Sequence, residues 1–201
     1  MRDLRAPAFV TTVAQRHGFD EATTASAARS SYCAALAIAS TYFVVSREML
    51  DQPAPAFELP ATGGKSFRLA EAKGRTVVLY FYPKDNTPGC TTEGQQFRDL
   101  HAEFQKANSE VYGISRDSLK SHENFKAKMA FPFDLLSDAE ENACQAFDVI
   151  RMKNMYGKKV RGIERSTFVI DSKGVLRREW RGVKVPGHAQ EVLEFVKTMK
   201  A

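Results

Sequence analysis

Cys90 stands where the sequence predicts a nucleophile. It follows segment 83–89, in which two prolines, an asparagine, an aspartate and a glycine predict a turn. Beyond it, apolar residues recur at helical spacing. The first turn of a helix exposes unpaired backbone N–H groups and the positive end of the helix dipole, and both favour an anion. Cys90 is therefore expected to react as a thiolate.

Ionisation alone contributes modestly to such chemistry. An ordinary cysteine is roughly 3% ionised near pH 7, and a pKa of about 6 would raise the thiolate fraction about thirtyfold. The remaining acceleration needs donors aimed at the charge that develops during reaction. Thr87 lies three residues before Cys90 and carries a hydroxyl able to turn toward the sulfur. The plain alternatives are that Cys90 is an inert buried cysteine and that Thr87 is an ordinary turn residue.

A strand and a helix must position this cysteine. Segment 76–82 is rich in β-branched and aromatic residues, which predicts a strand buried on both faces, as in a parallel sheet. Pro83 ends that strand. The following amphipathic helix carries Phe97, Leu100, His101 and Phe104 at helical spacing.

The remaining chain alternates strands and helices in the same manner. Segment 110–115 predicts a second parallel strand, segments 161–171 and 175–180 predict a hairpin, and segment 188–199 predicts a closing helix. Asp117 is expected to cap a helix whose inner face carries His122, Phe125 and Met129. The stretch Ser137-Asp138-Ala139-Glu140 has the form of a capping box and predicts a helix with Ala143, Cys144 and Phe147 on one side.

Composition and cysteine usage set the class of protein. The 201 residues are 43% apolar and 26% charged, which fits a soluble globular domain. The net charge of +5 is spread out, so the small basic clusters at 158–161 and 177–181 are interpreted as solvated faces rather than a nucleic-acid site. Three scattered cysteines argue against a disulfide scaffold or a zinc site. We therefore expect a reducing, cytoplasmic location with neither metal nor cofactor.

Residues 1–48 differ in character from the rest. They are rich in alanine, serine and threonine, and their apolar run, residues 32–45, is too short to span a membrane. Three interpretations stay open: an upstream stretch before a true start at Met49, a presequence that would imply export or an organelle, and an accessory helix. Cys33 lies in the apolar run and is most simply a small hydrophobic residue.

The spacing Pro83-x-x-x-Thr87-x-x-Cys90, within segment 81–93, resembles the active-site loop of peroxiredoxins of the bacterioferritin comigratory protein (BCP, or PrxQ) branch. The resemblance runs from about Asp51 to the C-terminus and includes segments 51–60 and 165–171. It implies a thioredoxin-like α/β fold over residues 49–201, with a central mixed sheet flanked by helices. The order of predicted strands and helices agrees with that fold.

The resemblance also implies roles in peroxide reduction. Cys90 would be the peroxidatic cysteine, which attacks a hydroperoxide and becomes a sulfenic acid. Thr87 would hydrogen-bond the thiolate and the incoming oxygen, Arg165 would supply a permanent positive charge, and Pro83 would shield the loop. Glu93 either orients Arg165 or is a surface glutamate of the first helical turn.

The sequence departs from many relatives at one position. Gln95 stands where they carry a resolving cysteine, five residues after the peroxidatic one. We therefore expect an external thiol (glutathione, glutaredoxin or thioredoxin) to reduce the sulfenic acid, in a monomer or weak dimer. Cys144 is expected to be buried and structural, although a disulfide with Cys90 stays open if the first helical turn unfolds.

Two other functions stay open at this stage. A thiol-disulfide oxidoreductase would use a Cys-x-x-Cys pair, but Thr87 occupies the first position of that spacing. A thioredoxin-like binding or chaperone module would have no peroxidase activity.

Overall fold

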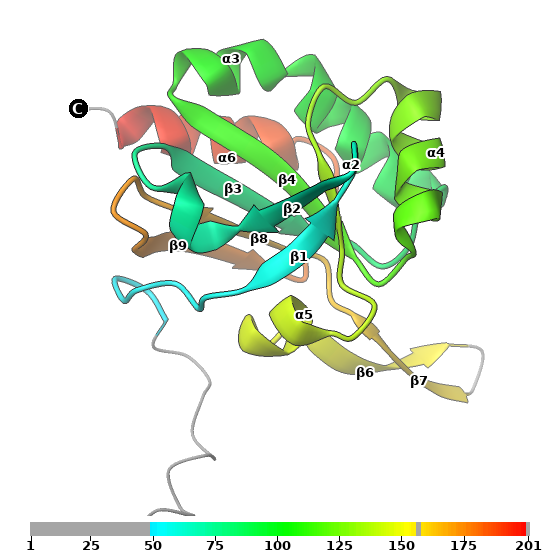
Figure 1. Cartoon of the computed structure of the whole chain (residues 1–201). Helices are drawn as coiled ribbons and strands as arrows, with labels where there is room; N and C mark the ends of the chain where they lie inside the picture. The colour runs from blue at the N-terminus through cyan, green and yellow to red at the C-terminus, as the bar shows by residue number, and fades with distance from the viewer. Residues whose placement is uncertain (1–48, 156–157, 200–201) are drawn as a thin grey trace, which may run out of the picture. The chain divides into compact units, whose positions relative to one another are not determined.

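The computed structural model describes residues 49–155 and 158–199, so the interpretations of residues 1–48 and Cys33 lie outside the described residues. A seven-stranded mixed sheet forms the centre (Figure 1). Its strands β3, β4 and β5 are parallel, whereas the outer strands pair antiparallel. Across the sheet the order is β2 (Lys65–Arg68), β1 (Glu58–Ala61), β5 (Leu135–Ser137), β4 (Ser109–Ser115), β3 (Thr76–Phe81), β8 (Ser166–Ile170) and β9 (Leu176–Arg181). The expected thioredoxin-like fold is confirmed.

Strand β3 divides the core into two clusters because its side chains alternate between the faces of the sheet. Val77, Leu79 and Phe81 join one cluster, and the intervening Val78 and Tyr80 join the other. All five are at most 2% exposed, which confirms the prediction of a strand buried on both faces.

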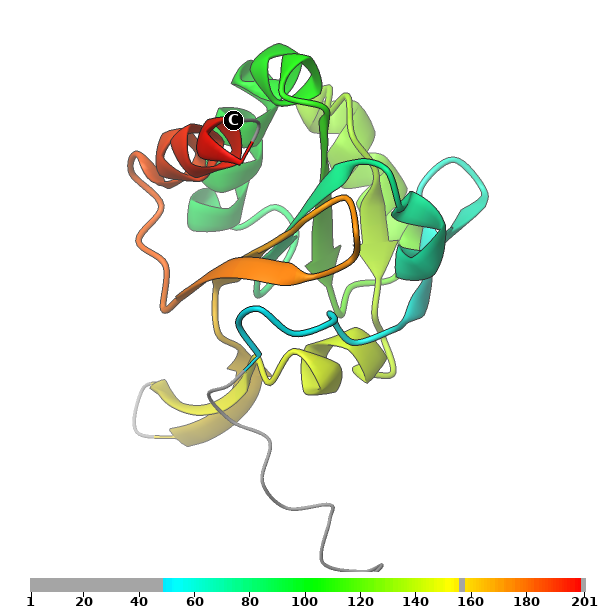
Figure 2. The same cartoon turned by 90° about the vertical axis from the view of Figure 1, so that its left-hand side faces the viewer.

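Four helices cover one face of the sheet, as Figure 2 shows from the side. They are α2 (Pro88–Asp99), α3 (His101–Lys106), α4 (Leu119–Met129) and α6 (His188–Thr198). The sequence predicts one helix through Phe104, but the backbone at Leu100 leaves the helical region (φ −96°, ψ 1°) and separates α2 from α3. Phe97 and Phe104 nevertheless pack together, with ring centroids 5.9 Å apart.

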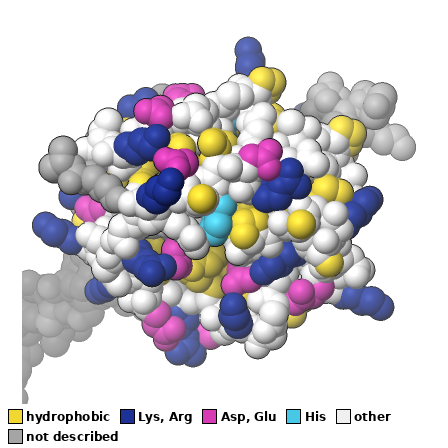
Figure 3. Space-filling view, turned by 90° about the horizontal axis from the view of Figure 1, so that it is seen from above, with side chains coloured by type: hydrophobic (Ala, Val, Ile, Leu, Met, Phe, Trp, Pro, Cys, Tyr) yellow, Lys and Arg dark blue, Asp and Glu magenta, His cyan; other side chains and the backbone are white. Residues whose placement is uncertain are grey.

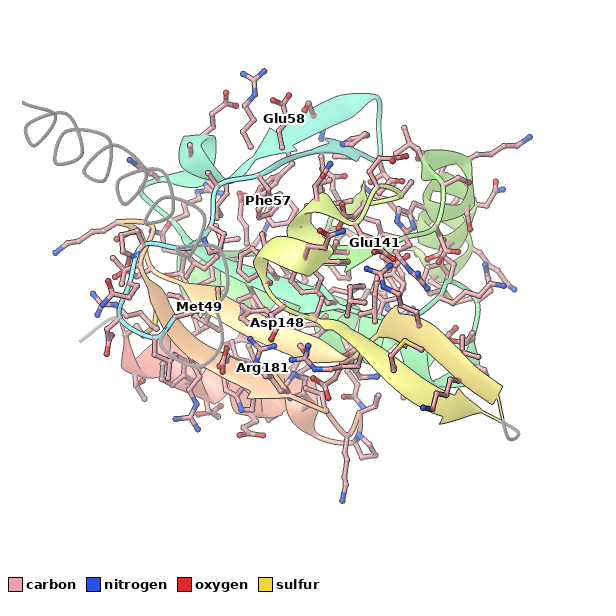
Figure 4. All side chains as sticks on the ribbon, turned by 90° about the horizontal axis from the view of Figure 1, so that it is seen from below. Met49, Phe57, Glu58, Glu141, Asp148 and Arg181 are labelled. Carbon is pink, nitrogen blue, oxygen red and sulfur yellow. The ribbon has the colours of Figure 1, made fainter. Side chains whose placement is uncertain are left out.

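The opposite face carries η1 (Leu69–Ala72), α5 (Asn142–Ala146) and a separate hairpin of β6 (Ile150–Met155) and β7 (Lys158–Ile163). Figure 4 views this side, where Phe57 packs edge-on against Phe147 at 5.8 Å. Arg181 lies beside Asp148 and donates to the carbonyl oxygens of Asp148 and Phe147. These bonds join the end of α5 to strand β9.

Two of the expected caps are wrong. Ser118 rather than Asp117 caps α4, because its hydroxyl accepts from the backbone N–H of Ser121 while the carboxylate of Asp117 is engaged elsewhere. Ser137 does not open a capping box, because it is the last residue of strand β5. Helix α5 begins later, after Glu141.

The expected strand 161–171 is two strands. Segment 158–163 belongs to the hairpin with β6, and β8 begins only at Ser166. The hairpin between β8 and β9 and the closing helix α6 are confirmed.

Charged side chains of both signs are interspersed on the face in Figure 3, with hydrophobic side chains scattered between them. In the two basic clusters, Arg161, Arg177 and Arg181 pair with neighbouring carboxylates. This agrees with their interpretation as solvated faces. Among the described residues, no helix is both long and apolar enough to cross a bilayer.

Candidate active site

Cys90 lies in the first turn of α2, as the third residue of the helix. Pro88 opens the helix, a position that suits proline because the first N–H of a helix has no intrahelical partner. Thr87 precedes it as the N-cap in an extended conformation. Cys90 is buried, at 2% exposure, and follows the turn after strand β3.

The sheet brings Arg165 to the same place. β8 runs antiparallel to β3 with Phe81 opposite Ser166. Arg165, one residue before β8, therefore stands where β3 ends and the turn to Cys90 begins. Its Nη2 donates to the sulfur of Cys90 at 3.2 Å, and its guanidinium lies against Gly89 in the first turn of α2.

Glu93 holds the other side of that guanidinium. Its Oε2 forms an ion pair with Arg165 Nη1, and the glutamate side chain is only 1% exposed. Burial raises the pKa of Glu93 to about 7, against the opposing effect of Arg165. Burial also opposes the charge of Arg165, but Glu93 and Cys90 outweigh it and raise the pKa of the guanidinium. Of the two interpretations of Glu93, the structure supports the one in which it orients Arg165.

Thr87 is close in sequence, but its hydroxyl points differently from the expectation. It donates to the carbonyl oxygen of Lys84 at 3.0 Å, so its single proton is not directed at Cys90. Asn86, which lies between Lys84 and Thr87, adopts a left-handed conformation (φ 56°) that closes this tight turn. Pro83 is half-buried at the start of the turn. The structure thus brings Cys90 and Arg165 into contact, with Thr87 and Pro83 in the adjoining turn.

Residues 50–179 match the model of the AhpC/TSA family. The chain belongs to this family. Peroxiredoxin Bcp of Xanthomonas campestris pv. campestris is 54% identical over 151 residues, which are 74% of this chain and 94% of the relative. Peroxiredoxin Bcp of Bacillus subtilis is 48% identical over 150 residues, 75% of this chain and 96% of the relative. The chain is thus a peroxiredoxin of the BCP/PrxQ branch and a thiol peroxidase.

Solved structures agree with this assignment. A bacterioferritin comigratory protein of X. campestris, studied for alkyl peroxide reduction in trapped intermediate and ligand complexes, matches with a TM-score of 0.69 and 52% identity. The match covers 72% of this chain and 92% of the X. campestris chain. BcpB of Mycobacterium tuberculosis matches with a TM-score of 0.69 and 32% identity over 77% of this chain and all of its own.

The second described cysteine of this peroxiredoxin lies in a different environment. Cys144 in α5 is fully buried, and its backbone N–H donates to Asp138 Oδ2 at 2.7 Å. Burial, followed by the neighbouring Asp138, raises the pKa of the Cys144 thiol. Both Cys90 and Cys144 are free thiols. A protonated, buried thiol is a poor nucleophile, which fits the structural role expected for Cys144.

Sequence reasoning missed a buried polar group beside the active-site turn. Asp85, within the turn, contacts His122 of α4 at 2.9 Å between Oδ2 and Nδ1. The sequence places His122 on the inner face of its helix, which is confirmed, since the residue is fully buried. A buried histidine needs partners, and that was the available signal. Its partner lies 37 residues earlier in a turn, which helical spacing does not reveal.

Proposed function

We propose that this peroxiredoxin reduces hydrogen peroxide and organic hydroperoxides through a sulfenic acid at Cys90. The contact between Arg165 Nη2 and the sulfur of Cys90 at 3.2 Å carries the proposal. A guanidinium at this distance favours the thiolate and can stabilise negative charge that develops on peroxide oxygen. The alkyl peroxide reduction described for the X. campestris protein supports including organic hydroperoxides.

In the proposed step, the thiolate sulfur attacks the terminal O–H oxygen of the hydroperoxide. An S–O bond forms as the O–O bond breaks, and the other oxygen leaves as hydroxide or alkoxide and takes a proton from water. The sulfur is oxidised by two electrons to the sulfenic acid, and the peroxide is reduced to water or alcohol.

The turn supplies the remaining groups. Arg165 stabilises both the thiolate and the breaking O–O bond, and Glu93 fixes its orientation. Thr87 would act after its hydroxyl rotates from the carbonyl oxygen of Lys84 toward the bound peroxide. Pro83 shapes the turn and limits access of water to it.

An external thiol completes the proposed cycle. It attacks the sulfenic sulfur and releases water, and a second thiol then reduces the mixed disulfide to free Cys90. Glutathione, glutaredoxin and thioredoxin are the candidate reductants. Cys144 is not needed, because it is buried and its raised pKa keeps it protonated. Reduced thiols of this kind belong to a cytoplasmic setting, which is the location we propose.

Peroxide consumption by three variants tests this proposal. Cys90→Ser should abolish turnover with every thiol supplied, while Cys144→Ser should retain the wild-type rate with an external thiol. Arg165→Gln should lower kcat/KM by about a hundredfold or more, since it removes a charged donor at the reacting atoms. Arg178→Gln is the matched control, because that side chain stacks on Trp180 rather than on the site. Undiminished turnover in Cys90→Ser would refute the proposal, and loss in Cys144→Ser would make Cys144 a resolving cysteine.

A further inference from the structure

The carboxylate of Asp85 is buried and fully occupied by donors. Tyr82 Oη donates to Oδ1 at 2.7 Å, Ser121 Oγ donates to Oδ2 at 2.7 Å, and His122 Nδ1 lies 2.9 Å from Oδ2. Asp85 is 5% exposed, Tyr82 is 1% exposed and His122 is fully buried. Burial opposes ionisation of Asp85, but these partners outweigh it and lower the pKa of the carboxyl group. Asp85 is therefore an anion at neutral pH.

Both ring nitrogens of His122 face acceptors. Nδ1 faces the Asp85 carboxylate, and Nε2 lies 3.2 Å from the carbonyl oxygen of Leu136 in strand β5. The Tyr82 hydroxyl also lies 3.4 Å from Nδ1. The buried ring of His122 therefore connects the active-site turn, through Asp85 and Tyr82, to strand β5.

This pair anchors the turn that holds Cys90. The backbone N–H of Asp85 donates to Asp117 Oδ2 at 2.8 Å, so both the main chain and the side chain of Asp85 are fixed. The next contact along the chain is the bond from the Thr87 hydroxyl to the carbonyl oxygen of Lys84. Helix α2 starts at the following residue, and Cys90 is in its first turn. A continuous series of contacts therefore runs from α4 to the nucleophile.

We propose that Asp85 and His122 are positioning residues for the peroxidase reaction. Their buried contact holds turn 83–87 on helix α4 and keeps the first turn of α2 formed, so that the sulfur of Cys90 stays against Arg165. The same pair limits access of large thiols, because Cys90 is 2% exposed while the turn is closed. This inference rests on the proposed function of Cys90, and it assigns the pair no contact with peroxide.

The test compares two chemically identical changes at aspartates that contact the same helix, α4. Asp85→Asn removes the charge that faces His122. Asp134→Asn is the matched control, because Asp134 forms an ion pair with Lys126, which is also on α4 but away from the turn. Two rates are measured on the full chain: oxidation of Cys90 by hydrogen peroxide in a single turnover, and labelling of Cys90 by a polyethylene glycol maleimide. A Cys33→Ser and Cys144→Ser background leaves Cys90 as the single cysteine of the chain, so that the label reports Cys90 alone.

Asp85→Asn should slow oxidation at least tenfold and speed labelling at least tenfold, while Asp134→Asn changes each rate less than twofold. Unfolding of the whole chain would also slow oxidation and speed labelling, so circular dichroism first establishes that each variant is folded when the two rates are measured. Ser121→Ala, which removes one donor to Asp85 but keeps its contact with His122, should shift each rate in the same direction as Asp85→Asn does, by a smaller factor. This milder variant keeps the test decisive if Asp85→Asn does not fold. Adding His122→Asn to Asp85→Asn should slow oxidation no further, since the two residues act as one unit.

Three results would each overturn the inference. They are wild-type rates in folded Asp85→Asn, equal effects of Asp134→Asn and Asp85→Asn, and additive losses in the double variant. Absence of Cys90-dependent peroxide consumption in the wild-type chain is a separate result. It would refute the proposed function itself.

Discussion

Arg165 carries one positive charge and faces two groups that can be negative, the sulfur of Cys90 and the carboxylate of Glu93. Because burial raises the pKa of Glu93 to about 7, the charge of this carboxyl group changes near neutrality. Its Oε1 has no hydrogen-bond partner among the described residues, which adds to the cost of the ionised form. We infer that, once Glu93 is protonated, the sulfur of Cys90 is the single group of these two that can attract the guanidinium by its negative charge.

Glu93 should make stability depend on pH. The folded chain holds this proton up to about pH 7, whereas the unfolded chain releases it near pH 4.5. Between these values the folded state binds more protons, so the contribution of Glu93 to stability falls as pH rises. Relative to Glu93→Gln, the wild-type free energy of unfolding should fall by something on the order of 3 kcal/mol across this window. Urea unfolding at pH 4.5, 5.5 and 7 measures it.

Glu71→Gln is the control for this titration, because Glu71 is an exposed glutamate paired with Arg68. It should leave the pH dependence of unfolding as in the wild type. If the free energies of unfolding of Glu93→Gln and the wild type change in parallel with pH, Glu93 is already ionised throughout the range.

The sequence indicates the residues that are proposed to react more readily than it indicates their hydrogen-bond partners. Cys90 and Thr87 follow from local turn and helix signals, and Arg165 follows from the family resemblance. The orientation of the Thr87 hydroxyl depends on the left-handed turn at Asn86, which the sequence does not specify. The burial of Glu93 depends on long-range packing and could not be read from its position in a first helical turn.

At the scale of elements, the end of α4 stores strain. Ala130 caps the helix in a left-handed conformation (φ 52°, ψ 46°), which costs an L-residue with a β-carbon about 1 kcal/mol or more. Ala130→Gly should therefore raise the free energy of unfolding by about 0.5 kcal/mol, after the added flexibility of the unfolded chain is subtracted. Ala127→Gly, within the same helix, should lower it by about 1 kcal/mol. Urea unfolding of both variants checks the opposite signs, and equal signs would contradict the strain.

Helix α2 is held close to segment 131–133 by a glycine. A β-carbon at Gly94 would lie well inside van der Waals contact with Phe131 Cζ. Gly94→Ala should therefore lower the free energy of unfolding by about 1–3 kcal/mol and slow peroxide oxidation of Cys90, since α2 must shift. Adding Phe131→Leu should recover part of both losses. Failure of that second change to help would place the strain elsewhere.

The errors in predicted elements share a physical origin. Helical spacing of apolar residues continues through Leu100, yet the chain bends there while both flanking phenylalanines stay in one cluster. The capping-box pattern at 137–140 is overridden by parallel pairing, since Ser137 lies opposite Ser115 in β4. Segment 161–171 is predicted as one strand, but its residues up to Ile163 pair with β6, and β8 begins only at Ser166. In each case tertiary pairing outweighs the local signal.

At the scale of the whole molecule, we propose that residues 49–201 form the peroxiredoxin domain and residues 1–48 an extension. A chain that starts at Met49 should keep the peroxidase rate and a melting temperature within about 1 °C of the full chain. A chain that starts at Phe57 should melt several degrees lower, because it loses the backbone bonds from Asp51 to Leu176 and from Ala54 to Gly174. Thermal melting and peroxide consumption test both, and loss of activity in the Met49 chain would give the extension a role.

Cys90, the proposed nucleophile, and Arg165 are 75 residues apart in the chain and are brought together by the pairing of β3 with β8. Ribosomes add about 5–20 residues per second, so Cys90 is made roughly 4–15 seconds before Arg165. During this interval the nascent chain lacks the cation that the proposed mechanism requires. On that mechanism, peroxide attacks Cys90 rapidly only once the sheet has closed, and an unfinished polypeptide is spared the oxidation that the finished enzyme carries out.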